Sequence, residues 1–170
     1  MTNALKISVP EGLPFIDYER EFDFPVAEVF RAHKEPDLIA QWLGPRGLKM
    51  DIDHYDFRTG GSYRYLHTGP DGTAYGFNGV FHTVRENDFA IQTFEFDGYP
   101  DVVSIESMTF EDLGGGRTRL VGHGVYPSLE ARDGMAQSGM EDGMTESYER
   151  LDEVLAGAAT GQRQSGRVPA

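Results

Sequence analysis

The 170-residue chain contains no cysteine. Disulfide bonds, thiolate metal sites and cysteine nucleophiles are therefore excluded, and the composition fits a reducing cytoplasm, where we expect the protein to be located. The five histidines show no H-x-x-x-H or other compact spacing, so we expect neither a metal site nor a cofactor. The sequence also lacks a G-x-S-x-G serine motif and a phosphate-binding glycine loop.

Positive charge is scarce, because 15 Lys and Arg residues stand against 28 Asp and Glu residues and the formal net charge is −13. Nucleic acid and anionic lipid surfaces repel such a chain, so we expect no nucleic-acid partner. No apolar run approaches the about 18 residues of a membrane span, and we see no signal peptide, so we expect no membrane insertion. In contrast, 21 glycines, 11 phenylalanines and 8 tyrosines suit short strands, tight turns and an aromatic interior.

The length of the chain predicts one domain. A chain of this size can bury roughly 70% of its unfolded surface, so a true core is possible without covalent crosslinks. We place the domain at residues 15–156, after an irregular segment at 1–14. The small, polar residues 157–170 show no periodicity and are predicted to form a disordered tail.

The apolar pattern changes period along the domain. Alternation over residues 15–24 predicts a half-buried strand, interrupted on its apolar face by Arg20. Pro25 and Pro36 then open two short helices at the first-turn position that proline favours. Six further strands separated by glycine-rich turns follow, near residues 49–57, 62–68, 74–85, 89–96, 102–112 and 117–125.

A long amphipathic helix is predicted at residues 139–155, with a break or bend before it near Gly134–Gly139. One side of this helix is acidic, and the other carries an apolar stripe. The stripe consists of Met140, Met144, Tyr148, Leu151 and Leu155. We interpret the stripe as core laid across an antiparallel, curved sheet. The alternative is that its methionines and tyrosine line a pocket, because Met fills irregular space and tolerates varied ligands.

Short motifs accompany this order of elements. They are Phe24-Pro25 with Val29-Phe30-x-Ala32, Pro36-x-Leu38-x-x-x-Trp42-x-Gly44-Pro45, Asp56-x-Arg58-x-Gly60-Gly61-x-Tyr63-Arg64, Pro70-Asp71-Gly72, Thr109-Phe110-Glu111-Asp112, Gly116-Arg117-Thr118-Arg119-Leu120 and Gly139-Met140-x-x-Gly143-Met144. Over about residues 15–155 the ordered set resembles the START-like (SRPBCC) helix-grip superfamily, in particular the branch related to the C-terminal domain of the activator of Hsp90 ATPase.

This resemblance implies an α+β helix-grip (START/Bet v 1-like) fold, in which a strand, two short helices and a six-stranded antiparallel meander precede a long C-terminal helix packed across the curved sheet. It also implies a deep cavity between sheet and helix that takes small apolar or amphipathic molecules, lipids included. Leu43 and Met144 stand where many relatives carry Trp, which makes the wall softer and less aromatic. The candidate ligand-binding residues are Trp42, Tyr63, Tyr65, His67, Phe77, Phe94, Met108, Met140, Met144 and Tyr148.

Two residues are candidates for acid–base chemistry. His67 shares a strand face with Tyr63 and Tyr65, so it is either a polar anchor beside the cavity or a hydrogen-bonded histidine at its rim. Glu106 shares a face with Met108, so strict alternation turns its carboxylate inward, where burial would raise its pKa. A bulge in the strand would instead place this carboxylate in water.

Three functions follow as hypotheses. We favour binding of a small apolar or amphipathic ligand, with Trp42 as a ligand wall or as a packing anchor for the short helices. The second hypothesis is a cavity enzyme of the cyclase, aromatase or hydrolase kind, whose acid–base pair is Glu106 with either His67 or Tyr63. The third and weaker one is modulation of an Hsp90-type chaperone ATPase, because the full activator carries a further N-terminal domain that this chain is too short to contain. A homodimer formed through a strand edge or apolar patch also remains open.

Overall fold

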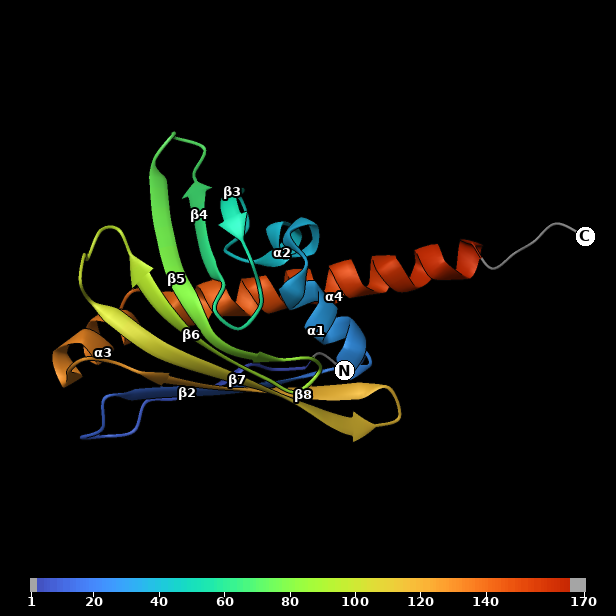
Figure 1. The fold of residues 1–170 in the computed structure, drawn as a ribbon, viewed down its shortest axis with the longest axis horizontal. Helices are drawn as coiled ribbons and strands as arrows, with labels where there is room; N and C mark the ends of the chain where they lie inside the picture. The colour runs from blue at the N-terminus through green and yellow to red at the C-terminus, as the bar shows by residue number, and fades with distance from the viewer. Residues whose placement is uncertain (1–2, 166–170) are drawn as a thin grey trace, which may run out of the picture.

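The computed structural model describes residues 3–165 and contains eight strands and four helices within them (Figure 1). The elements are β1 (Lys6–Ser8), β2 (Phe15–Phe22), α1 (Val26–Lys34), α2 (Pro36–Trp42), β3 (Lys49–Tyr55), β4 (Ser62–Thr68), β5 (Ala74–Arg85), β6 (Phe89–Phe96), β7 (Val103–Gly114), β8 (Arg117–Val125), α3 (Leu129–Ala136) and α4 (Met140–Ser165).

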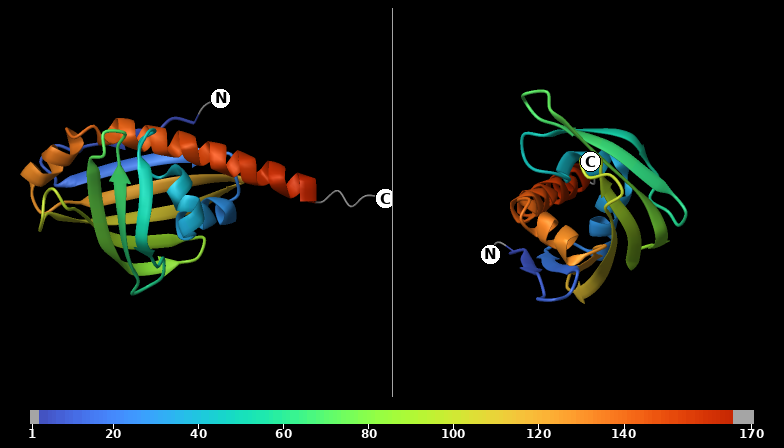
Figure 2. Two further views of the ribbon diagram at one scale, coloured as in Figure 1. Left: turned by 90° about the horizontal axis from the view of Figure 1, so that it is seen from above. Right: turned by 90° about the vertical axis from the view of Figure 1, so that its left-hand side faces the viewer.

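All strands belong to one antiparallel sheet with the order β1-β2-β8-β7-β6-β5-β4-β3. Strands β3 to β8 form a meander, and β2 returns to pair with β8 from Phe15↔Val125 to Phe22↔Thr118. The sheet curves strongly around α4, while α1 and α2 lie beside the same helix (Figure 2). The predicted α+β helix-grip fold is therefore confirmed.

The structure differs from the sequence-based expectation at both ends of the chain. The segment at 1–14 was expected to be irregular, but β1 pairs with the open edge of β2, and Arg132 donates to the carbonyls of Pro10 at 2.8 Å and Leu13 at 2.6 Å. The tail from residue 157 was expected to be disordered, but α4 continues to Ser165, past three alanines within 156–159, the residue type with the highest helix propensity. The rest of that predicted tail lies outside the described residues.

The predicted break before the long helix is present between α3 and α4. Ser128 caps α3 by accepting a hydrogen bond from the backbone N–H of Ala131 at 3.0 Å. Gly139 has φ +84°, a left-handed conformation that glycine adopts without a steric penalty, and α4 begins at the next residue.

The apolar stripe of α4 divides into two parts with different surroundings. Tyr148, Leu151 and Leu155 are buried and join the main core, where burial of a leucine side chain contributes about 1.5–3 kcal/mol. Met140 and Met144 are only partly buried. The core therefore lies under the middle of α4, and its first turns are left beside space that side chains do not fill.

Buried and partly buried polar contacts fix α4 in place. Arg20, which the sequence marked only as an interruption of a strand face, is 3% exposed and points inward. Its guanidinium makes two hydrogen bonds to the Asp152 carboxylate, at 3.0 and 2.6 Å, the bidentate geometry of a strong ion pair. Ser147 accepts from the backbone N–H of Gly44 at 2.9 Å, and Arg150 donates to the Gly44 carbonyl at 2.9 Å. The helix is thus tied both to β2 and to the loop after α2.

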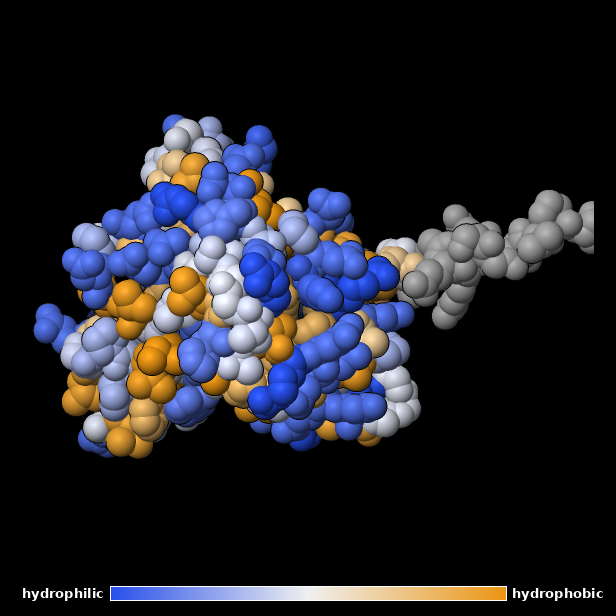
Figure 3. Space-filling view, in the orientation of Figure 1, coloured by the Kyte–Doolittle hydropathy of each residue, from blue (hydrophilic) through white to orange (hydrophobic). Residues whose placement is uncertain are grey.

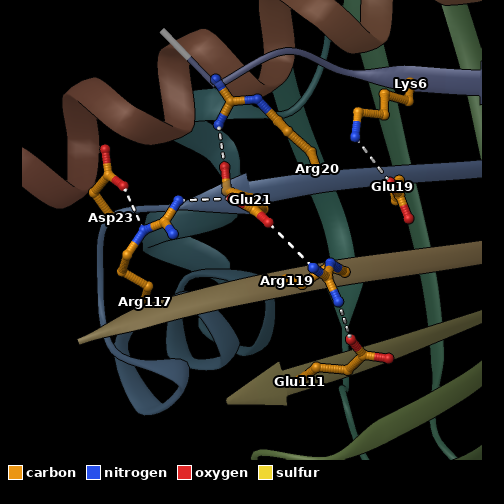
Figure 4. A network of polar contacts seen from close by, with 8 residues as sticks. All are labelled: Lys6, Glu19, Arg20, Glu21, Asp23, Glu111, Arg117 and Arg119. Atoms are coloured by element: carbon orange, nitrogen blue, oxygen red, sulfur yellow. Dashed lines mark hydrogen bonds and ion pairs between the residues drawn. The ribbon is translucent and has the colours of Figure 1, made fainter. Parts of the chain in front are cut away.

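The outer face of the sheet is charged. Arg117 bridges Glu21 at 2.7 Å and Asp23 at 3.0 Å, and Arg119 bridges Glu21 and Glu111, both at 3.2 Å (Figure 4). These exposed pairs each contribute little to stability. Hydrophilic residues cover much of the surface in Figure 3, and apolar residues appear there in separate groups. Within the described residues, no helix combines the length and apolar character that a membrane crossing requires.

Candidate functional site

A cavity of about 230 Å³ lies between the concave face of the sheet and the first turns of α4. Its wall is mostly aromatic and apolar, and it includes side chains from both layers of the fold. The lining residues are Ile16, Tyr18, His33, Ile39, Trp42, Leu43, Tyr55, Tyr63, Tyr65, Gln92, Phe94, Glu106, Met108, Gly124, Tyr126, Met135, Met140, Met144, Ser147 and Tyr148.

The side of the cavity wall formed by α3 and α4 carries flexible methionine side chains. Met140 and Met144 face the cavity from α4, and Met135 adds a third thioether from α3. Trp42 stacks on Tyr148 with ring centroids 5.9 Å apart, and its indole N–H donates to the Ala32 carbonyl at 2.9 Å. Trp42 therefore lines the cavity and also anchors the packing of the two short helices.

The sheet side of the wall is aromatic and held by hydrogen bonds. The Tyr55 hydroxyl donates to the His33 carbonyl and the Tyr63 hydroxyl donates to the Thr93 carbonyl, both at 2.6 Å. Burial raises the pKa of Tyr55, Tyr63 and Tyr65 above the ordinary value of 10.0, so these phenols stay neutral at physiological pH. Two of the three are committed to backbone carbonyls, which fixes their rings in the wall.

Glu106 faces the cavity, as strict alternation along β7 predicts. The strand is regular at this position, with Glu106 opposite Gln92 of β6 and Gly124 of β8, so no bulge turns the side chain outward. The Ser104 hydroxyl donates to the carboxyl at 3.2 Å. Burial raises the pKa of Glu106 above its ordinary value of 4.5, and the hydrogen bond from Ser104 opposes that shift only in part.

A group of phenols surrounds this carboxyl. The negative charge of Glu106 contributes to the raised pKa of five tyrosines on β2, β4, the segment after β8, and α4, namely Tyr18, Tyr63, Tyr65, Tyr126 and Tyr148. Burial is the largest cause for each of them, and it raises the pKa of Tyr148 to about 12. One acidic group therefore lies at the centre of an otherwise uncharged aromatic wall.

His33 is a wall residue that our sequence interpretation did not include. It is 3% exposed, and its ring packs edge-on against Trp42 at 4.8 Å and Phe110 at 5.1 Å. Its Nδ1 lies 2.8 Å from the Val29 carbonyl, which can only accept, so Nδ1 carries the proton and Nε2 offers a lone pair. Within the described structure that Nε2 has no partner, and burial lowers the pKa of His33 to about 4.

Two of the predicted ligand-binding residues do not line the cavity. His67 shares the inward face with Tyr65, but its ring packs directly against the backbone of Gly44, where an added Cβ would lie 2.6 Å from the ring. Burial, with a smaller contribution from the Arg150 charge, lowers the pKa of His67 to about 4. Phe77 stacks on Phe94 and is likewise absent from the lining.

The predicted pair of Glu106 and His67 is therefore not assembled in one wall, because Glu106 lines the cavity and His67 does not. The alternative partner, Tyr63, does line the cavity with Glu106. The described residues also contain no group of three or more His, Asp and Glu side chains that could hold a metal ion. The chemistry available at the cavity is that of one carboxyl, one neutral imidazole and several phenols.

Comparison with known proteins identifies the family of this chain. Residues 23–156 match the family described as activator of Hsp90 ATPase homolog 1-like protein. No curated protein matches the chain in sequence.

Solved structures share the fold over most of the chain. A crystal structure of a Rhodobacter sphaeroides protein is 27% identical, with a TM-score of 0.83 over 90% of this chain and 98% of that one. A solution structure of an Arthrobacter aurescens protein is 28% identical, with a TM-score of 0.81 over 89% of this chain and 91% of that one. An AHSA1 protein from Silicibacter pomeroyi has the same fold at 24% identity, with a TM-score of 0.69 and coverage of 84% and 97%.

Proposed function

Because the chain belongs to the family of activator of Hsp90 ATPase homolog 1-like proteins, we propose that it uses the helix-grip fold to bind a small apolar or amphipathic molecule. The observation that carries this proposal is the cavity between the sheet and α4, about 230 Å³ in volume and lined by aromatic and methionine side chains. Binding sites for small molecules are typically preformed, mostly apolar concavities with a few polar groups, and this cavity has that character.

The volume limits the size of the ligand. An apolar cavity of about 150 Å³ is enough to hold a benzene molecule. The present cavity, at about 230 Å³, therefore suits a two-ring aromatic or a ring with a short chain. Met140 and Met144 adapt to irregular shapes because the thioether chain is flexible and polarizable, so the helical wall can follow ligands of different outline.

The proposal is tested with 1-aminonaphthalene, a two-ring dye whose emission shifts to shorter wavelength in apolar environments. We expect saturable binding to the wild-type protein and weaker binding to Met144→Trp, because the larger side chain fills part of the cavity. Leu66→Trp is the matched control, since Leu66 is 38% exposed and does not line the cavity. Equal dye affinity in wild type and Met144→Trp would refute the proposed site.

Chaperone modulation is a second candidate, and the observation that favours it is the family match itself. Its test is the ATP turnover of an Hsp90-type chaperone with and without the added protein; unchanged turnover at saturating concentrations rejects it. The hypothesis of cavity chemistry keeps Glu106 and its alternative partner Tyr63, but the Tyr63 hydroxyl already donates to the Thr93 carbonyl, and we propose no reaction for this pair.

A further inference from the structure

Glu106 is the one carboxylic acid in the cavity wall among the described residues, and no lysine or arginine lines the cavity with it. The contrast with Arg20 is informative, because that buried charge has a bidentate carboxylate partner in Asp152. Glu106 has one hydrogen-bond donor, the Ser104 hydroxyl at 3.2 Å. A buried carboxylate without a cationic partner is costly, so Glu106 favours a ligand that brings a positive charge or a hydrogen-bond donor.

The groups that face Glu106 from the surrounding elements are neutral at physiological pH. They are the Ser104 hydroxyl on its own strand, Gln92 on β6, and the phenols of Tyr18, Tyr63, Tyr65, Tyr126 and Tyr148. Aromatic faces attract cations through their quadrupole, and tyrosine and tryptophan are the better partners. Carboxylate and rings thus favour the same kind of ligand group, one that is positively charged.

His33 adds to this selectivity farther along the cavity. Its ring lies against Phe110, which is four residues from Glu106 on the inward face of β7, a separation of about 13 Å along a strand. Its Nε2 offers a lone pair and no proton, because the proton of the neutral ring is on Nδ1. Glu106 and the Nε2 of His33 therefore both accept hydrogen bonds, and a ligand that donates hydrogen bonds satisfies them.

We propose that the cavity selects an amphipathic amine, whose protonated nitrogen lies against Glu106 among the tyrosine rings and whose apolar body extends along Trp42 and the methionines of α4. This inference rests on the proposed function, since it names the chemical class of ligand for the same cavity. It also predicts that carboxylate ligands such as fatty acids are disfavoured, because the wall offers an anion and no cation to receive them.

The test compares three ligands that share one apolar body: 4-phenylbutylamine, 4-phenylbutanol and 4-phenylbutanoate at neutral pH. Trp42 is the single tryptophan of the chain and lies in the wall, so its fluorescence reports occupancy without a label. We expect the amine to bind about tenfold or more tighter than the alcohol, as a charged hydrogen bond implies, and the carboxylate to bind weakest.

The variant Glu106→Gln should bring the amine affinity down to that of the alcohol and leave the alcohol affinity within about threefold. Glu111→Gln is the matched control, because it makes the same change on the same strand at the charged outer face. Wild-type affinities for amine and alcohol that are equal, or a preference for amine that survives Glu106→Gln, would overturn the inference while leaving the cavity proposal intact. Failure of all three ligands to bind would overturn both.

Discussion

The folded protein should lose stability at acidic pH, because His33 is buried in the cavity wall. Burial lowers the pKa of His33 in the folded protein to about 4, from an ordinary value of 6.5. Between these values the unfolded chain binds one proton more than the folded chain, so the free energy of unfolding falls as the pH falls. The contribution is fully present above pH 6.5 and lost progressively down to about pH 4.

The magnitude follows from the same two values. One pKa unit corresponds to about 1.4 kcal/mol, so lowering the pH from 7 to 5 should remove about 2 kcal/mol through His33. The variant His33→Asn has no titrating group, and its amide can still donate to the Val29 carbonyl that Nδ1 now contacts. We therefore expect the variant to be less stable at pH 7, because it lacks ring packing, but to lose about 2 kcal/mol less than wild type on going to pH 5.

Urea denaturation followed by far-ultraviolet circular dichroism at the two pH values measures this difference. Ile39→Val is the control, since trimming a buried methyl group costs about 1 kcal/mol at either pH and adds no titrating group. His67 is titrated in the same direction and remains in both proteins, so some acid sensitivity persists in the variant. If His33→Asn and wild type lose the same free energy between pH 7 and pH 5, His33 is not held neutral by burial and the argument fails.

Three further predictions concern the cavity and the helix that covers it. Met144→Trp should change the melting temperature little, while thermal-shift assays show reduced stabilisation by large ligands. Asp152→Ala leaves the buried Arg20 without its carboxylate partner and should lower the free energy of unfolding, measured with urea, by about 2–3 kcal/mol. Glu153→Ala removes an exposed ion pair with Arg46 and should lower it by less than about 1 kcal/mol. Similar losses in the two variants would contradict the importance of the buried pair. Glu106→Gln should raise the melting temperature more at pH 8 than at pH 5, because the raised pKa of Glu106 makes the wild-type fold lose stability as the pH rises above 4.5; an equal change at both values would refute this.

The strands of the meander were predictable because local signals mark both their ends and their faces. Glycine-rich turns separate them, and each predicted strand lies within two residues of its observed bounds. Alternation also placed Tyr63, Tyr65 and Glu106 on the inward face, where the structure has them. Side-chain direction in a regular strand depends only on the period of two, so it needs no knowledge of the partner strands.

The ends of the chain were less predictable, because their secondary structure depends on contacts with residues elsewhere in the sequence. β1 has three residues, too few to show a period, and it forms because β2 offers an unpaired edge. In the last turns of α4, small and polar residues without periodicity suggested disorder, but the alanines among them favour the helix and extend one that tertiary contacts already stabilise.

His33 and His67 show what the periodicity of the sequence can and cannot predict about the site. Val26, Val29, Phe30 and His33 follow the i, i+3, i+4, i+7 pattern, so His33 could have been placed on the inward face of its helix. His67 was placed on the correct face, but the backbone of Gly44 lies against its ring. Alternation predicts which way a side chain points, and it contains no information about a loop that covers it.

The pairing of β2 with β8 also determines when this protein can fold during its synthesis. Phe15 and Val125 are register partners although about a hundred residues separate them. At about 5–20 residues per second, a ribosome needs roughly 5–20 s to make the chain between them, and during that time β2 has no neighbour on its β8 side. Its inward face remains uncovered for longer still, because Phe22 packs against Tyr148 of α4, which is made after β8. β2 is thus made early but is paired with β8 only late in synthesis. During this interval the nascent chain is exposed to aggregation or to capture by chaperones.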